Sequence, residues 1–161
     1  PVWSHPMHRH PDVHALADQL KSLGLMGLEA YHSSMSEGEA DVLVSFEKVE
    51  AVRWLRYLKK GGTLVVNDFE IYSLPVLTGT AIYPDGVIEK LRAEVPNLKV
   101  FSAGAIAHEL GNIKAQNVVL LGALVKALGL ENLDWKSVLT ELVPPKLLDL
   151  NLKAFDAGLS Q

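Results

Sequence analysis

The sequence predicts an α/β protein, a three-layer α/β/α domain built around a mainly parallel sheet of about five strands. Short apolar runs of β type alternate with longer stretches that have apolar residues at helical spacing. This alternation implies crossover connections between parallel strands. Hydrophobic residues make up 48% of the 161 residues, which is enough to bury a core in a single domain over residues 1–161. After residue 102 the pattern is helical only.

Each element is predicted from its own local signals. Strands are expected at the β-type apolar runs, residues 2–5, 28–32, 41–46, 63–67 and 98–102. Helices are expected where apolar residues recur every three or four positions, over residues 11–24, 49–58, 86–94, 104–110, 115–128, 134–142 and 145–157. Cations followed by glycines favour a helix end, so residues 59–62 are expected to stop the second helix. Residues 68–85 carry two prolines and a glycine, and they predict a long excursion with a short hairpin.

Composition narrows the function classes. Fifteen basic and nineteen acidic side chains give a net charge of −4, with no local basic patch, so nucleic acid is not an expected partner. The absence of cysteine removes disulfides, thiolate nucleophiles and iron–sulfur ligation by these residues, and it fits a cytoplasmic protein. The longest apolar stretch, residues 118–125, is too short to cross a membrane. The start at Pro1, without an initiator Met, suggests an excised, trimmed or recombined segment.

Histidines are concentrated at the beginning of the chain. Five of the six lie in the first 32 residues, namely His5, His8, His10, His14 and His32. Imidazole is a good ligand for zinc, nickel, copper or iron, so a metal site at His5, His8 and His10 is one interpretation. The alternative is a histidine-rich loop that takes up only adventitious zinc or nickel, because no motif elsewhere completes a site.

The first segment, PVWSHPMHRHPDVHALADQLKSLGLMGLEAYHSSMSEGE over residues 1–39, resembles part of a PHP-family phosphoesterase. In that family the histidine of the His-Pro pair ligates a metal in a multinuclear site, and His5 is the matching position. His32 matches a later loop position, while Met35 stands where many members have another histidine. The early H-x-H motif of the family has no match here. The resemblance therefore implies a fragment of a phosphoesterase site.

The remaining residues show a longer resemblance. EGEADVLVSFEKVEAVRWLRYLKKGGTLVVND, LPVLTGTAIYPD and AHELGNIKAQNVVLLGALVKALGLE follow the order of the β subunit of indolepyruvate:ferredoxin oxidoreductase. This subunit is related to the γ domain of 2-oxoacid:ferredoxin oxidoreductases, and the likeness covers residues 37–161. The G-x-G-G-Q-G turn and the M-x-Q-R-G-G loop of that family are not found in this sequence. The two likenesses together predict a possible chimera joined near residues 36–41, with a natural gene fusion or a divergent family member as the alternative.

The oxidoreductase resemblance implies a larger catalytic partner subunit that holds thiamine diphosphate and iron–sulfur clusters. In this chain Asn67 and Asp68 follow a buried strand, at the edge where open α/β sheets bind ligands, and they are candidate cofactor-binding residues. Asn112 and Asn117, near a helix start, are the other candidates, since amides and free backbone N–H groups could meet a partner or an anion. Ordinary helix capping is the alternative for both.

These observations predict a non-catalytic α/β domain that resembles the small subunit of an indolepyruvate (2-oxoacid):ferredoxin oxidoreductase and has no complete active site. A residual metal-dependent phosphoesterase that uses the N-terminal histidines is the alternative function. The leucines of residues 145–157 spread around more than one helix face, which predicts surplus apolar surface and a homo-oligomer.

Overall fold

The computed structural model describes residues 36–161. The strands predicted at residues 2–5 and 28–32, and the helix predicted at residues 11–24, lie outside the described residues. Three strands make a parallel sheet in the order β1-β2-β3: β1 (Ala40–Ser45), β2 (Leu58–Asn67) and β3 (Asn97–Phe101). The described sheet is thus all parallel, as expected, and it holds three of the five predicted strands.

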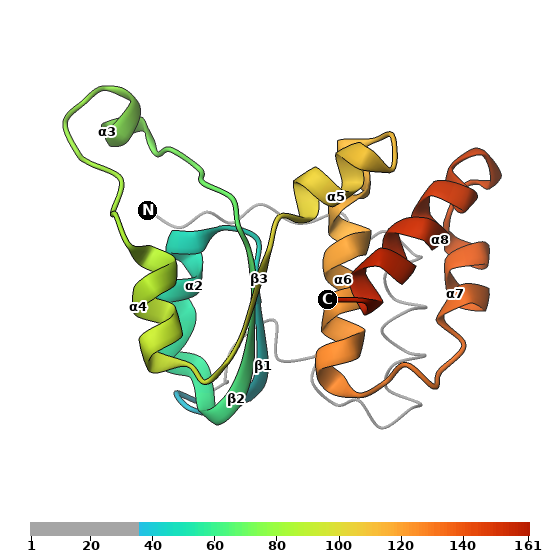
Figure 1. The fold of residues 1–161 in the computed structure, drawn as a ribbon, viewed down its shortest axis with the longest axis horizontal. Helices are drawn as coiled ribbons and strands as arrows, with labels where there is room; N and C mark the ends of the chain where they lie inside the picture. Colours follow the sequence, from blue (N-terminus) through green and yellow to red (C-terminus); the bar gives the residue numbers. More distant parts are fainter. Residues whose placement is uncertain (1–35) are drawn as a thin grey trace. The chain divides into compact units, whose positions relative to one another are not determined.

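Helices cover both faces of this sheet (Figure 1). The crossover helices α2 (Lys48–Trp54) and α4 (Val87–Glu94) pack on one face, around Leu64 and Val66 of β2. The opposite face carries α5 (Ala103–Glu109), α6 (Gln116–Leu128) and α8 (Pro145–Leu159). Side chains of a strand alternate between faces, so successive residues of each strand serve the two cores. The predicted three layers are confirmed for the described residues.

The second helix ends earlier than its sequence predicts. α2 stops at Trp54, a 3₁₀ turn η2 (Leu55–Tyr57) follows, and residues 59–62 belong to β2. In the pairing with β1, Leu58 lies opposite Ala40 while Thr63 lies opposite Val42, so the intervening residues bulge out of the ladder. Gly61 has a φ of +82°, and a Cβ on Gly62 would lie 2.9 Å from the Asp41 carbonyl oxygen. These glycines therefore allow the bulge in β2, because Gly61 adopts a positive φ and Gly62 lies too close to β1 for a side chain.

The segment between β2 and α4 is an excursion, as predicted, but it contains no hairpin. It runs from Asp68 to Gly86, and its only regular element is the short helix α3 (Leu74–Leu77). Figure 1 shows it leaving the sheet beyond the carboxyl end of β2, with α3 at its tip. Bonds within the tip close it: the amides of Thr80 and Ala81 both donate to the Pro75 carbonyl, at 2.9 and 3.0 Å. The amides of Thr80 and Ala81 are therefore used within the turn and do not pair with another strand.

The helical C-terminal part follows its prediction closely. The 3₁₀ turn η3 (Ile113–Ala115) leads into α6, and α7 (Trp135–Leu142) packs with α8 around Phe155. None of residues 118–125 is exposed, so α6 is the central helix that its apolar sequence predicts. In α8, Phe155 is buried, Leu148, Leu150 and Leu152 are half-buried, and Leu147 is 38% exposed. Most of the surplus apolar surface expected on α8 is therefore covered within the chain, whereas the homo-oligomer stays a prediction.

Helices α6 and α8 cross with their backbones in contact. A Cβ built on Gly122 would lie 2.3 Å from the Phe155 carbonyl oxygen, and one built on Gly158 would lie 2.0 Å from the Val119 carbonyl oxygen. Real Cβ atoms do not approach backbone so closely, so both positions require glycine. The crossing fixes α8 on α6 and, through Ala154, closes the core on this face of the sheet.

We predict that Gly122→Ala destabilises the protein by about 3 kcal/mol or more, because backbone on both helices must move to admit one methyl group. Gly104→Ala is the matched control. Its Cβ would meet only side-chain atoms at 3.6 and 3.9 Å, and alanine favours the helix by about 1 kcal/mol, so this variant should be equally or more stable. Urea denaturation of the two variants measures the difference, and equal losses of unfolding free energy would contradict the close crossing.

Candidate functional site

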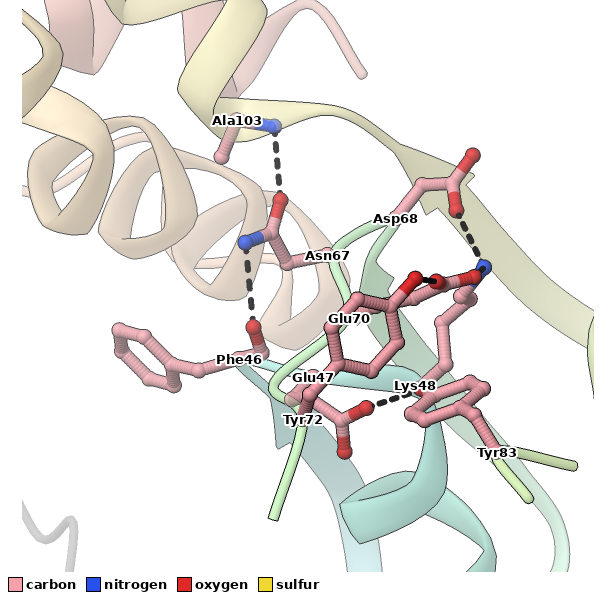
Figure 2. Close-up of polar contacts among 9 residues, drawn as sticks. All are labelled: Phe46, Glu47, Lys48, Asn67, Asp68, Glu70, Tyr72, Tyr83 and Ala103. Atoms are coloured by element: carbon pink, nitrogen blue, oxygen red, sulfur yellow. Dashed lines mark hydrogen bonds and ion pairs between the residues drawn. The ribbon is translucent and has the colours of Figure 1, made fainter. Parts of the chain in front are cut away.

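Polar residues gather at the carboxyl end of the sheet, where β1 and β2 finish and the excursion begins (Figure 2). This is the edge of an open parallel sheet at which ligands and partners usually bind. Seven of these residues form the candidate site: Glu47, Lys48, Asn67, Asp68, Glu70, Tyr72 and Tyr83. The sequence predicted Asn67 and Asp68 among them.

Asn67 is buried, and both ends of its amide are used inside the protein. Its Nδ2 donates to the Phe46 carbonyl at 3.1 Å, and its Oδ1 accepts from the Ala103 amide at 2.9 Å. Figure 2 shows the side chain between these two backbone groups. Asn67 thereby joins the end of β1, the end of β2 and the start of α5. Its place at the sheet edge was predicted, but its amide is a structural bridge, and the predicted cofactor contact would need these partners to be released.

Glu47 caps helix α2 and faces the excursion. Its carboxylate accepts from the Glu50 amide at 2.8 Å and from the Tyr83 hydroxyl, and its side chain is almost fully buried. Burial works against the charged form, but the hydrogen bonds from Tyr83 and from backbone amides outweigh it, so the pKa of Glu47 lies below its usual value. Burial and the bond to Glu47 raise the pKa of the Tyr83 phenol. At neutral pH a carboxylate therefore faces a neutral phenol.

Lys48 contacts the first three residues of the excursion, Asp68, Phe69 and Glu70. Its Nζ lies 2.5 Å from Glu70 Oε1 and 3.4 Å from Asp68 Oδ1, and its amide donates to the Phe69 carbonyl. The Tyr72 hydroxyl donates to the second Glu70 oxygen at 2.6 Å, and its ring meets that of Tyr83 edge to face. The hydrogen bond with Glu70 raises the pKa of Lys48 and lowers that of Glu70. The bond to Glu70 also raises the pKa of Tyr72, so at neutral pH Lys48 is charged, Glu70 is charged and Tyr72 is neutral.

An open pocket of about 360 Å³ lies beside this network. Four carboxylates line it, those of Asp68, Glu70, Asp85 and Glu89, against the single ammonium of Lys48. The N-terminus of α4 also opens here, at Gly86 and Val87. This excess of negative charge favours a cationic side chain and disfavours a phosphate.

The other predicted site residues lie apart from this cluster. Asn112 caps η3 by accepting from the Lys114 amide at 3.0 Å, which is the capping alternative. Asn117 is exposed in the first turn of α6, whose N-cap is Ala115. A cofactor contact by either residue stays a prediction. His5, His8 and His10 lie outside the described residues, and residues 36–161 contain no cluster of three or more potential metal ligands.

Sequence reasoning missed the other five site residues, namely Glu47, Lys48, Glu70, Tyr72 and Tyr83. Lys48 could have been found, since it follows the end of a predicted strand just as Asp68 does. Tyr83 lies 36 positions from Glu47, and no periodic signal connects the two. Only the path of the excursion brings them together.

The sequence of this chain matches a known protein family and several of its members. The pyruvate ferredoxin/flavodoxin oxidoreductase family matches residues 26–161. Indolepyruvate oxidoreductase subunit IorB of Pyrococcus horikoshii is 40% identical over 155 residues, which cover 91% of this chain and 77% of that protein. The same subunit of Thermococcus kodakarensis is 37% identical over 157 residues, with the same coverage. The chain belongs to the pyruvate ferredoxin/flavodoxin oxidoreductase family.

Solved structures agree on the fold. The γ subunit of a keto/oxoacid ferredoxin oxidoreductase from Geobacter sulfurreducens has a TM-score of 0.55 at 24% identity, covering 78% of this chain and 65% of that one. Pyruvate oxidoreductase subunit PORC from Thermotoga maritima has a TM-score of 0.52 at 21% identity, covering 77% and 64%. The chain thus spans slightly less than two thirds of these two proteins. At such identities the likeness concerns the fold alone.

The comparisons do not support the expected chimera. Residues 37–161 alone are 125 of 161 residues, or 78% of the chain, whereas the two archaeal relatives match 91% of it. The family match likewise begins at residue 26 and crosses the expected junction near residues 36–41. No comparison gives a phosphoesterase, and none supports the description of the chain as non-catalytic.

In residues 36–161, no helix combines the length and apolar character that crossing a membrane requires.

The cofactors of the family do not fit the candidate site. An iron–sulfur cluster needs thiolates, and these 161 residues include no cysteine. Thiamine diphosphate would bring phosphate charge into a pocket already lined by four carboxylates.

We predict that Asn67→Ala lowers the free energy of unfolding by about 3 kcal/mol, because the buried Ala103 amide and the partly buried Phe46 carbonyl both lose their partner. Asn112→Ala, which removes an exposed cap, should lower it by about 1 kcal/mol. Chemical denaturation measures both values. A loss for Asn67→Ala no greater than that for Asn112→Ala would contradict the bridging role.

The stability that Glu47 contributes depends on pH. The folded-state pKa of Glu47 is depressed, so its contribution to stability is present above its unfolded pKa and is lost as pH falls through the folded value. Tyr83→Phe removes the phenol donor and should lower stability by about 1–2 kcal/mol at pH 7 and by less under acid conditions. Denaturation between pH 7 and pH 3 tests this, with Tyr57→Phe as the control. A loss independent of pH would show that Glu47 ionisation is not coupled to Tyr83.

Proposed function

We propose that this chain is the small subunit of an indolepyruvate:ferredoxin oxidoreductase and acts together with a larger catalytic subunit. The observation that carries the proposal is the 40% identity with an indolepyruvate oxidoreductase subunit over 91% of the chain. Indolepyruvate is the proposed substrate because the curated relatives carry its name. Thiamine diphosphate and the iron–sulfur clusters are assigned to the larger subunit.

The described residues support a role in an assembled enzyme. Large apolar side chains are exposed along the excursion beyond the sheet, at Phe69, Ile71, Leu74, Leu77 and Ile82. A chain that worked alone would rarely leave so much apolar surface in water on one segment. The cysteine-free composition agrees with a division of labour in which the partner holds the redox centres.

Co-expression with the larger subunit of an archaeal indolepyruvate oxidoreductase tests the proposal. We expect a stable complex that reduces ferredoxin when indolepyruvate and coenzyme A are supplied, and we expect lower rates with pyruvate and 2-oxoglutarate. The larger subunit alone is the control and should be much less active. Failure to form a complex would contradict the subunit assignment, and a preference for another 2-oxoacid would contradict the substrate assignment alone.

A further inference from the structure

The excursion carries the greatest concentration of exposed apolar side chains in residues 36–161. We define the arm as residues 69–83. Six of the thirteen large hydrophobic residues exposed in the described part of the chain lie on it: Phe69, Ile71, Tyr72, Leu74, Leu77 and Ile82. Ile82 is 89% exposed and Leu74 is 72% exposed. Residues 71–83 include no charged side chain, although charged residues make up 21% of the sequence.

The arm is held in place rather than loose. Its tip is closed by bonds from Thr78, Thr80 and Ala81 to the Pro75 carbonyl. Its base is fixed twice, by Glu70 on Lys48 and by Tyr83 on Glu47, as Figure 2 shows. A segment fixed in this way loses little conformational freedom on binding, so more of its apolar contact contributes to affinity.

The base of the arm is acidic. The pocket beside it is lined by four carboxylates and one ammonium, and Glu70 and Asp68 already contact that ammonium. Asp85, which precedes α4, and Glu89, in its first turn, are both exposed. A surface complementary to this one would be apolar opposite the arm and would present Lys or Arg opposite the pocket.

We propose that the arm and the acidic pocket together form the docking surface for the larger subunit, which supplies an apolar groove for Leu74, Leu77 and Ile82 and a cationic side chain for the pocket. The inference rests on the proposed function, which supplies the partner. A second copy of this chain fits less well, because a symmetric pairing of two arms would bring two acidic pockets to the same interface.

The apolar half is tested with the triple variant L74S/L77S/I82S of the full chain. All three side chains are exposed, so folding should be unchanged by circular dichroism and urea denaturation. Titration against the purified larger subunit should show an affinity about 100-fold weaker than that of the unmodified chain. The matched control is L128S/L142S/L147S, which removes three exposed leucines from α6, α7 and α8 and should bind within about threefold of the unmodified chain.

The charged half is tested with D85K/E89K. The rate of association with the larger subunit should fall about tenfold at low salt, and the slowing of association by added salt should disappear. E141K/D149K changes the net charge by the same amount on α7 and α8 and should keep the salt dependence.

The outcomes separate the two proposals. An unmodified chain that does not bind the larger subunit overturns the proposed function and the docking surface with it. An unmodified chain that binds, together with an arm variant that binds equally well, overturns the docking surface alone. Arm-dependent dimers of this chain in light scattering, formed in place of the complex, would assign the arm to a second copy and also overturn the inference.

Discussion

The buried amide of Asn67 connects the three parts on which the functional edge of the sheet depends. Asn67 is the last residue of β2; its side chain donates to the Phe46 carbonyl, just after β1, and accepts from the Ala103 amide, the first of α5. The turn that carries Glu47 and Lys48 begins at the end of β1. The arm begins just beyond the end of β2, and the second helical layer begins with α5. Because the bond to the Ala103 amide is buried and the bond to the Phe46 carbonyl is partly buried, an apolar side chain in place of the amide would leave both backbone groups without this partner. The positions of the polar site and of the arm both follow from this bridge.

The second helical layer depends on small residues in the same way. Gly122 and Gly158 let α6 and α8 touch through their backbones, and alanines at 103, 107, 115 and 154 let the layer lie close to the sheet. Most large apolar side chains of this region are thereby buried or half-buried. The arm carries the greatest concentration of exposed apolar side chains in residues 36–161. It begins just beyond the carboxyl end of β2, whereas the bulge at Gly61 and Gly62 lies in the first half of that strand. The fold thus separates a largely covered helical layer from an exposed apolar segment.

The polar network explains how an uncovered apolar segment can keep a defined shape in water. Lys48 and Glu70 pair where both are partly shielded, and the phenols of Tyr72 and Tyr83 each give a hydrogen bond to a carboxylate. The arm therefore does not need its apolar side chains to pack against the sheet in order to be ordered. Those side chains remain available for contact with another molecule, which fits a family whose named relatives are subunits.

The sequence alone determined the α/β class, the parallel strands at β1, β2 and β3, and every helix from α4 onward, because short apolar runs and helical periodicity are local signals. It also placed Asn67 and Asp68 at the sheet edge, since that position follows from the end of a buried strand. It could not place Tyr83 on Glu47, because that contact depends on the route of the arm through space. It misread residues 59–62 as a helix stop because the same cations and glycines also suit a bulge, and only the proximity of Asp41 on β1 decided between the two. Tertiary packing also decided which segment exposes more apolar surface. Phe155 of α8 is covered by neighbouring helices, whereas Ile82 of the arm has no such cover.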